Sequence, residues 1–452
     1  MKSKHIKLSI KILTACLITY FLFAFLPYVG RVYVSDETKH TFSMDNFHGQ
    51  YTSPERVMLL EQPQEAFFHR VHLISKAQEQ ILLASFAFRR GETSDIIVGA
   101  LLDAADRGVN VTILNNAVGG LMPRRYRDVL AAHENISVYL FNRPRFFEPQ
   151  FINASMHDKY MVIDDTFLIL GGRNIGDRDY APYGHNRHVS LDREVLVYST
   201  DPSFRGSIAD VQEYFFSKIN SNRVDLHTSR GNRGRGYLQA MFDNWHFLNA
   251  NVPFDYYLNT IATNRITLIT NPAEDAKKES IVAYNLMMLS MNSDRVIVQS
   301  PYIALTRRNL NTFLQTAQDR DFTLLTNSLA STPNLPSFSA YTADRRRIIN
   351  SMAVYEFQCT QTSIHAKTFL FDDRLTAIGS FNINERSIRS DTESMLIIDS
   401  YEFNAITRDA INSLMAQSLR VGEDGEQARV PFGKRMLYTV AGHLLRPIRI
   451  LF

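Results

Sequence analysis

Short apolar runs of strand length alternate with longer amphipathic stretches along most of this chain. The first series joins a strand pattern at residues 81–88, a helix pattern at 96–105 and a second strand pattern at 109–114. Residues 295–328 repeat this order of strand, helix and strand. Alternation at this spacing indicates βαβ units and predicts mixed or parallel sheets in an α/β fold.

The repetition divides the chain into two homologous α/β halves. We place the first half at residues 55–200 and the second at 265–400, with a linker or insertion at 201–264 and a C-terminal region at 401–452. Each half is expected to be a mixed β-sheet flanked by helices. We expect the two halves to pack with pseudo-twofold symmetry.

The N-terminal segment has the pattern of a membrane anchor. Residues 1–11 contain four lysines, and residues 12–29 are uncharged. About 18 apolar residues is near the lower limit for a helix that spans a bilayer. The basic residues before the span predict a cytoplasmic N-terminus and a body on the extracytoplasmic side of the cell membrane. We favour a single-pass, uncleaved signal anchor; a cleaved signal peptide and a lipoprotein signal ending at Cys16 are alternatives.

The C-terminal tail mixes basic and apolar residues. Lys434, Arg435, Arg446 and Arg449 lie among leucines and isoleucines. This mixture suits a helix at the membrane surface, where cations meet anionic head groups. A terminal helix packed on the body fits the pattern equally well.

The composition is that of a globular protein, with 45% hydrophobic and 21% charged residues. Its two cysteines, Cys16 and Cys359, are too few for a disulfide scaffold or a cysteine-ligated metal site. Lys and Arg outnumber Asp and Glu by 49 to 46, so the net charge of +3 does not indicate a nucleic-acid-binding protein. We therefore expect no nucleic-acid partner.

Both halves carry the same set of polar residues. In each half a histidine is followed two positions later by a lysine, then by an aspartate, and then by a Gly-[Gly/Ser]-x-Asn stretch. The two copies are 208 positions apart at every one of these residues. They are His157, Lys159, Asp164 and Asn174 in the first half and His365, Lys367, Asp372 and Asn382 in the second.

The spacing of this motif has a physical reason. Residues two apart on a strand point to the same face, so we expect each His–Lys pair to project together from continuous strands at 156–163 and 364–371. Two imidazoles and two ammonium groups then face one cleft. Lysine and asparagine side chains donate to the non-bridging oxygens of a phosphate. Two histidines, one as nucleophile and one as general acid, split a phosphodiester in two steps without a metal or a cofactor.

The duplicated motif resembles that of the phospholipase D (PLD) superfamily, and the likeness spans nearly the whole chain after the N-terminal helix. The finer similarity is to bacterial cardiolipin synthases, especially their C-type branch. It rests on the stretches GGRNIGD at 171–177, LTNSLA at 325–330 and IGSFN at 378–382.

This resemblance implies a phosphohistidine intermediate, with His157 as the nucleophile and His365 as the general acid and then the base. It also implies that Lys159, Lys367, Asn174 and Asn382 hold the phosphate. Asp164 and Asp372 belong to the motif, and the resemblance implies that they act structurally; we expect each to ion-pair within its own half.

Two glutamates lie in similar apolar strands after the motifs. Glu194 follows the first motif and Glu393 follows the second. A carboxylate on an otherwise apolar strand needs a partner. We expect each glutamate to accept a hydrogen bond from Nδ1 of a motif histidine and so to fix its tautomer. A salt bridge to a buried Arg or Lys is the alternative.

A loop of aromatic and basic residues comes directly before the first motif. Residues 143–152 contain three phenylalanines and two arginines. They either dip into the bilayer beside the cleft or form a loop packed on the core.

Together these features predict a membrane-bound phosphatidyltransferase that acts on phosphatidylglycerol. Phosphatidylglycerol, phosphatidylethanolamine and another alcohol are the alternatives for the acceptor. Hydrolysis to phosphatidic acid shares the first step and is the alternative, since exclusion of water from the cleft decides the outcome. A phosphodiesterase or nuclease is disfavoured by the near-neutral charge.

Overall fold

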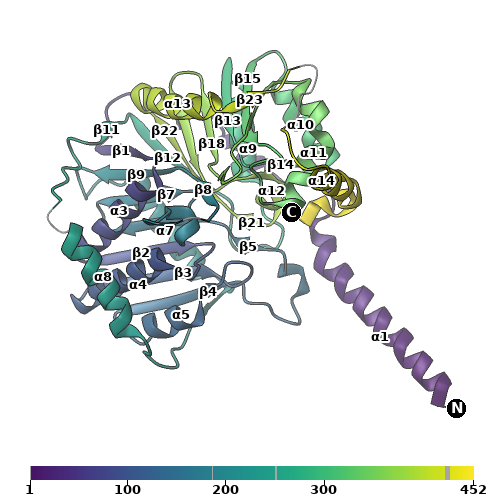
Figure 1. Cartoon of the computed structure of the whole chain (residues 1–452), viewed down its shortest axis with the longest axis horizontal. Helices are drawn as coiled ribbons and strands as arrows, with labels where there is room; N and C mark the ends of the chain where they lie inside the picture. Colours follow the sequence, from purple (N-terminus) through teal and green to yellow (C-terminus); the bar gives the residue numbers. More distant parts are fainter. Residues whose placement is uncertain (1, 186, 250–251, 423–427, 452) are drawn as a thin grey trace.

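The computed structural model describes residues 2–185, 187–249, 252–422 and 428–451. Two open β-sheets form the body, with helices on their outer faces. One long helix, α1 (Lys2–Phe25), extends away from this body (Figure 1).

The first sheet belongs to the first half and is mixed, as predicted. Strands β2, β3 and β4 run parallel, and the strands on the other side of β2 pair antiparallel. Across the sheet the order is β10 (Val224–Leu226), β4 (Ile136–Phe141), β3 (Asn110–Asn116), β2 (Gln80–Ser85), β6 (Lys159–Ile163), β7 (Phe167–Gly171), β9 (Glu194–Ser199), β1 (Glu55–Leu60) and β11 (Ile261–Ala262).

The second sheet repeats this topology. Its parallel strands β13, β15 and β16 correspond to β2, β3 and β4, and the rest pair antiparallel. The order is β12 (Arg265–Thr270), β22 (Ser394–Asp399), β19 (Leu375–Gly379), β18 (Thr368–Phe371), β13 (Arg295–Gln299), β15 (Asp321–Asn327), β16 (Ala353–Phe357) and β23 (Ser418–Arg420).

Helices flank both sheets because the sheet strands are apolar on both faces and must be covered. The helices of the first half are α3 (Pro63–Lys76), α4 (Glu92–Asp106), α5 (Arg124–Leu130), α6 (Asp177–Tyr180), α7 (Ser207–Ile219) and α8 (Arg235–Asn249). Those of the second half are α9 (Ile281–Met291), α10 (Arg307–Thr316), α11 (Leu335–Ile349), α12 (Glu385–Arg389), α13 (Tyr401–Met415) and α14 (Phe432–Leu444). Short elements complete the chain: α2 (Asp36–Thr41), η1 (Leu26–Tyr28), η2 (Met44–Asn46), η3 (Pro149–Phe151), η4 (Arg446–Leu451) and the two-stranded pair of β14 (Ile303–Ala304) with β20 (Ile383–Asn384).

One hydrophobic cluster is shared by the two halves, in addition to the clusters within each half. Leu170 and Val197 of the first sheet and Ile378 and Leu396 of the second belong to one cluster of fully buried side chains. The offset of 208 that relates the motifs also relates Leu170 to Ile378. Equivalent residues therefore meet at the contact between the sheets, as pseudo-twofold packing requires.

The stretch expected to be a linker, residues 201–264, contributes elements to the first half instead. Strand β10 pairs with β4, and β11 pairs with β1. Helix α8 packs closely on α4, since a Cβ added to Gly99 would lie 2.2 Å from the carbonyl oxygen of Leu238. The second half is extended in the same way by α13 and β23. Both extensions complete the hydrogen bonds of a sheet edge, which is why they are structured.

Helix α1 is the candidate membrane span. By length and composition, His5–Tyr28 can cross a membrane. At the end of this span, Tyr28 is fully buried on the body, and the Arg389 guanidinium donates a hydrogen bond to the carbonyl of Gly30 at 3.0 Å. The base of the helix is thus fixed to the second half.

The C-terminal helix α14 is packed on the body through one face. Tyr438 contacts Phe338 of α11, and a Cβ at Gly442 would lie 2.4 Å from the carbonyl oxygen of Ser339. The other face exposes apolar side chains, including Phe432 and Leu444. The packed helix is therefore observed, and a membrane role for its exposed face remains a prediction.

Candidate active site

Each motif histidine lies at a break between two strands, rather than on the continuous strand that we expected. His157 follows β5 (Ser155–Met156) and precedes β6. The reason is that β5 leaves the first sheet and pairs with β21 (Asp391–Thr392) of the second half. The backbone N–H of His157 then donates to the carbonyl of Thr392 at 3.1 Å, which brings the histidine beside Glu393.

The second half makes the reciprocal exchange. Strand β17 (Thr362–Ile364) pairs with β8 (Val189–Leu191) of the first half. The backbone N–H of His365 donates to the carbonyl of Leu191 at 2.7 Å, beside Asp192. These short crossed pairings place each histidine next to an acid from the opposite half.

Each crossed acid contacts Nδ1 of its histidine. Nδ1 of His157 lies 3.0 and 3.1 Å from the two carboxyl oxygens of Glu393, which also accepts hydrogen bonds from the hydroxyls of Ser380 and Ser387. Nδ1 of His365 lies 2.5 Å from Asp192. A partner on Nδ1 fixes the ring orientation and leaves Nε2 for the reaction.

The expected role of Glu194 is wrong. Its carboxylate is 2.8 Å from the guanidinium of Arg70 and 3.9 Å from that of Arg173, and it contacts neither motif histidine. The salt bridge to a buried arginine, the alternative at the sequence level, is what the structure shows. The expected contact is correct for Glu393.

Strand register explains why Asp192 takes this place. Gly171 pairs with Glu194, whereas the equivalent Gly379 pairs with Met395, so Asp192 is the counterpart of Glu393. His157 and Asp192 are 35 positions apart and His365 and Glu393 are 28 apart, so the first half has an insertion of seven residues. Sequence reasoning matched two glutamates and missed this insertion.

The second position of the Gly-[Gly/Ser]-x-Asn stretch is glycine in one half and serine in the other because the acid beside it differs. A Cβ added to Gly172 would lie 2.1 Å from Oδ1 of Asp192, so glycine leaves the room that this carboxylate occupies. At the equivalent position, the Ser380 hydroxyl donates to Glu393. This difference was a signal in the sequence that the two acids are held differently.

The motif lysines are buried beside their histidines. The Lys159 ammonium donates to the carbonyl of His157, and that of Lys367 donates to the carbonyl of His365 and lies 3.1 Å from its Nε2. Burial lowers the pKa of Lys159 to about 7, and the charge of Lys367 adds to this effect. The two ammonium groups therefore interact across the contact between the halves.

The motif asparagines are buried with unused hydrogen-bonding capacity. Oδ1 of Asn174 accepts a hydrogen bond from the backbone N–H of Ala87 at 3.2 Å. This bond uses the oxygen of the amide and leaves its N–H groups for another partner. Oδ1 of Asn382 is buried and has no hydrogen-bond partner within the described part of the chain. Asn174 lines the same cavity as His365. The phosphate-binding role of both asparagines stays a prediction.

Among the described residues, the motif aspartates form no ion pair of the kind that we expected. Asp164 accepts hydrogen bonds from the backbone N–H groups of Gln78, Glu79 and Gln80, at 2.9–3.1 Å. Asp372 accepts from those of Asp294 and Arg295 at 2.9 Å. These carboxylates tie the turn after each motif strand to the strand beside it, so their role in the structure is to hold the motif in place.

Burial gives the two histidine–acid pairs different charges. It raises the pKa of Glu393 to about 8 and lowers that of His157 well below its usual value, so this pair carries no net charge at neutral pH. Although burial opposes ionisation of Asp192, Lys367 and His365 hold its pKa below the ordinary value. Burial and Lys367 lower the pKa of His365 to about 3. His365 is thus neutral beside an ionised acid.

A polar cavity of about 500 Å³ contains His365 and Asn174 in its lining, together with Arg178, Asp179 and Tyr302. Buried Asp179 lies 3.3 Å from Arg89, and burial raises the pKa of Asp179 to about 6. Volumes of roughly 300–1,000 Å³ are usual for small-ligand sites. A polar head group in this cavity would lie beside a motif histidine.

The loop at 143–152 lies against the candidate membrane span. Phe146 stacks on Tyr20 of α1 with ring centroids 5.4 Å apart, and the hydroxyl of Tyr28 donates to the carbonyl of Gln150 at 2.5 Å. Phe146 and Phe147 are 72% and 91% exposed, so this part of the loop is not packed on the core.

Comparison with known proteins gives a consistent result. The family described as cardiolipin synthase, PLD-like domain, matches residues 71–218 and 286–415, which hold both motifs. Cardiolipin synthase C of Escherichia coli (strain K12) is 27% identical over 390 residues, covering 75% of this chain and 80% of that protein. An uncharacterized protein of Helicobacter pylori (strain ATCC 700392 / 26695) is 28% identical over 413 residues, covering 80% and 79%.

Among solved structures, the phosphatidylserine synthase of Haemophilus influenzae Rd KW20 is similar with a TM-score of 0.65. It is 13% identical, and the match covers 88% of this chain and 95% of that one. At this identity the similarity concerns the fold, and it includes both halves.

Proposed function

This chain belongs to the cardiolipin synthase family with PLD-like domains, and from that premise we propose that it transfers the phosphatidyl group of phosphatidylglycerol through a phosphohistidine intermediate. The single observation that carries the proposal is the crossed pairing of His157 with Glu393 and of His365 with Asp192. It orients two imidazoles from opposite halves in one buried site. Family membership makes the chain an enzyme that acts on phospholipids; the intermediate and the substrate are our proposal.

In the proposed first step, Nε2 of His157 forms a bond to the phosphorus of phosphatidylglycerol. The bond from phosphorus to the glycerol head group breaks, and the protonated form of His365, which the ionised Asp192 stabilises, gives its proton to the departing oxygen. Lys159 and Lys367 stabilise the charge that develops on the non-bridging oxygens, and the amides of the motif asparagines donate to the same oxygens.

In the second step, a hydroxyl of another phosphatidylglycerol gives its proton to His365 and attacks the phosphorus. The bond between phosphorus and His157 breaks, and cardiolipin leaves. The ionised Asp192 supports this assignment, since a carboxylate on Nδ1 stabilises the imidazolium that His365 forms when it takes a proton. The uncharged His157–Glu393 pair suits the nucleophile.

The loop at 143–152 supports transfer over hydrolysis. Tyr20, which Phe146 contacts, precedes the end of the candidate span at Tyr28 by eight residues, or about 12 Å of helix. The loop, which directly precedes the first motif in the chain, then lies in the hydrocarbon region, where lipid rather than water surrounds it.

The test is to incubate purified protein with vesicles of labelled phosphatidylglycerol, with and without phosphatidylethanolamine, and to separate the products. We expect cardiolipin. Phosphatidic acid as the sole product over a range of lipid densities would favour the hydrolase and contradict transfer. The His157→Ala and His365→Ala variants serve as controls, and each is expected to lose turnover.

We also propose that α1 crosses the membrane once and places the body on the extracytoplasmic side. The lysines before the span support this orientation. A reporter fused after the C-terminus and active only outside the cytoplasm is the expected result. Activity of a cytoplasm-specific reporter in the same fusion would reverse the orientation.

A further inference from the structure

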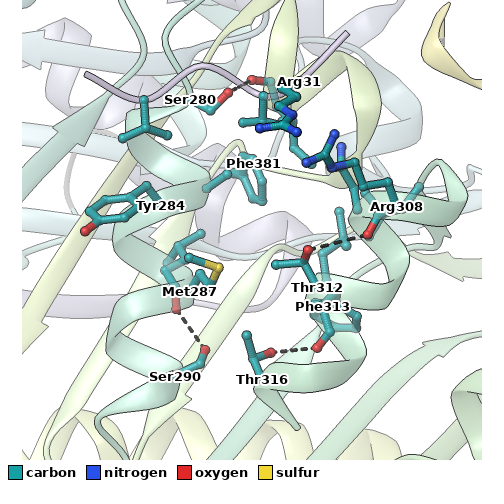
Figure 2. A pocket seen from close by; sticks show the side chains of 18 of the residues that line it. Arg31, Ser280, Tyr284, Met287, Ser290, Arg308, Thr312, Phe313, Thr316 and Phe381 are labelled. Carbon is teal, nitrogen blue, oxygen red and sulfur yellow. Dashed lines mark hydrogen bonds between the residues drawn. The ribbon is translucent and has the colours of Figure 1, made fainter. Parts of the chain in front are cut away.

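A second cavity, of about 370 Å³, lies in the second half (Figure 2). Helices α9 and α10 form its walls, residues 31–34 cover one side, and Phe369, Phe381 and Ile383 close its inner end. Within the described residues it shares no lining residue with the cavity at His365. It is therefore a separate site.

The interior of this cavity is apolar. Leu286 and Met287 of α9 and Phe313 of α10 face it, and Figure 2 shows Met287 and Phe381 pointing into the same space. No Asp or Glu among the residues described here contributes to the lining. Contact between water and an apolar surface is unfavourable in free energy, so a hydrocarbon chain is the ligand that fits this cavity.

The rim is cationic. Figure 2 shows the side chains of Arg31 and Arg308 beside each other at one edge. Both are exposed, and in the described parts of the chain neither has a carboxylate within salt-bridge distance, whereas Lys39 on the same rim is 2.8 Å from Asp36. Two guanidinium groups without an acid between them favour an anion, and arginine binds phosphate through several donors at once.

The position of the rim identifies the source of such a ligand. The candidate membrane span ends at Tyr28, three residues before Arg31. The rim thus lies at the level of phospholipid head groups. We propose that this cavity binds one acyl chain of an anionic membrane phospholipid, with the lipid phosphate between Arg31 and Arg308. This lipid is bound and not converted, so the proposal does not depend on the proposed function.

A bound lipid would also pack behind the phosphate-binding residue Asn382. Phe381 and Ile383, which flank it, face the lipid cavity. Asn309 and Thr306 at the start of α10 donate to the carboxylate of Glu385 at 2.8 and 2.9 Å. These hydrogen bonds connect the α10 wall of the cavity to the segment 381–385, which contains Asn382. Occupancy therefore restrains the position of Asn382 from behind.

The experiment uses the full-length His157→Ala protein in nanodiscs, so that turnover cannot contribute. The probe is phosphatidylglycerol with a photoreactive group at the end of one acyl chain. After illumination, mass spectrometry locates the labelled peptides. We expect saturable labelling of α9 and α10.

Matched variants test the rim and the interior. Arg31→Glu with Arg308→Glu is expected to reduce labelling roughly tenfold or more, because two favourable charges are reversed. Arg307→Glu is the control, since Arg307 is an exposed neighbour that does not line the cavity. Met287→Trp should fill the cavity and abolish labelling, while Met291→Trp, at a 46% exposed position of the same helix, should not.

Three outcomes would overturn the proposal. Labelling confined to residues 143–152 or to the surroundings of His365 would place the lipid elsewhere. Equal labelling by the matching phosphatidylcholine probe would show that the rim does not select an anion. Competition by a free fatty acid as strong as that by phosphatidylglycerol would show that the ligand is not a membrane phospholipid.

Discussion

At the scale of single residues, the two halves use different chemistry at equivalent positions. Glu393 is held by two serine hydroxyls and has a raised pKa, whereas Asp192 lies in the space left by Gly172 and is ionised. An asymmetric reaction, with one nucleophile and one proton carrier, needs such a difference within a symmetric frame.

The structure assigns Asp192, and not Glu194, as the acid beside His365, and this assignment can be tested directly. Asp192→Asn keeps the size of the side chain but removes the charge that supports the imidazolium, so kcat per folded molecule should fall about 10²–10⁴-fold. Initial rates on phosphatidylglycerol vesicles measure this.

Glu194→Gln is the matched comparison. It leaves the buried Arg70 without its acid, which should cost about 3–5 kcal/mol of stability, while kcat per folded molecule stays within a few-fold of wild type. Thermal unfolding and active-site titration separate the two effects. A large loss of kcat in Glu194→Gln without a fall in Tm would show that Glu194 supports a motif histidine after all.

The lowered pKa values predict how binding depends on pH. In the empty site the pKa of Lys159 is about 7, and an anionic phosphodiester beside it raises that pKa. The bound form then holds more protons than the free form, so affinity should rise as pH falls and weaken as pH increases above about 7.

Calorimetric titration with a soluble phosphodiester, in buffers that differ in ionisation enthalpy, measures this proton uptake. We expect about one proton taken up near pH 8. The Lys159→Met variant should take up less. Binding that is independent of pH between about 6 and 9 would contradict the assignment.

At the scale of elements, short strands that change sheets determine the site. Strands β5 and β17 each leave their own sheet and pair with β21 and β8 of the other half. A hydrogen-bonded pair of strands fixes neighbouring residues closely, so each histidine meets its acid without a long flexible connection.

The loop at 143–152 gives a prediction at this scale. If the loop enters the bilayer as proposed, Phe147→Asp places a charge in the hydrocarbon region, so activity on phosphatidylglycerol vesicles should fall by roughly tenfold or more. Activity on a water-soluble, short-chain phosphatidylglycerol should remain near that of the wild type, since Phe147 is outside the cleft. Equal losses on both substrates would show that the loop acts on the site itself and not on membrane entry.

At the scale of the whole molecule, one core joins the halves, so they should unfold together. Ile378→Ala removes a fully buried side chain from the shared cluster and is expected to cost about 2–5 kcal/mol. Calorimetry should show one transition at a lower temperature. Two transitions, with only the second half affected, would contradict a shared core.

Much of this architecture follows from local patterns. The strands of the first repeat and helix α4 lie within a few residues of their expected positions, because apolar periodicity and strand-helix alternation are local properties of the chain. The equal spacing of the two motifs likewise predicted that His157 and His365 belong to one site. Residues 201–264, predicted as a linker or insertion, contribute strands to the first half. The sequence did not indicate this, because β10 and β11 are short and are recognisable as strands only through the sheet edges that they complete.

The sequence by itself thus determined the duplication, the candidate membrane span and the motif residues, since each depends on residue type and spacing along the chain. Only the tertiary structure decided which acid faces which histidine, because the seven-residue insertion in the first half hides the equivalence of Asp192 and Glu393. The exchange of strands between the halves and the cavity behind Asn382 likewise arise from contacts between segments far apart in the chain, which spacing along one half does not encode.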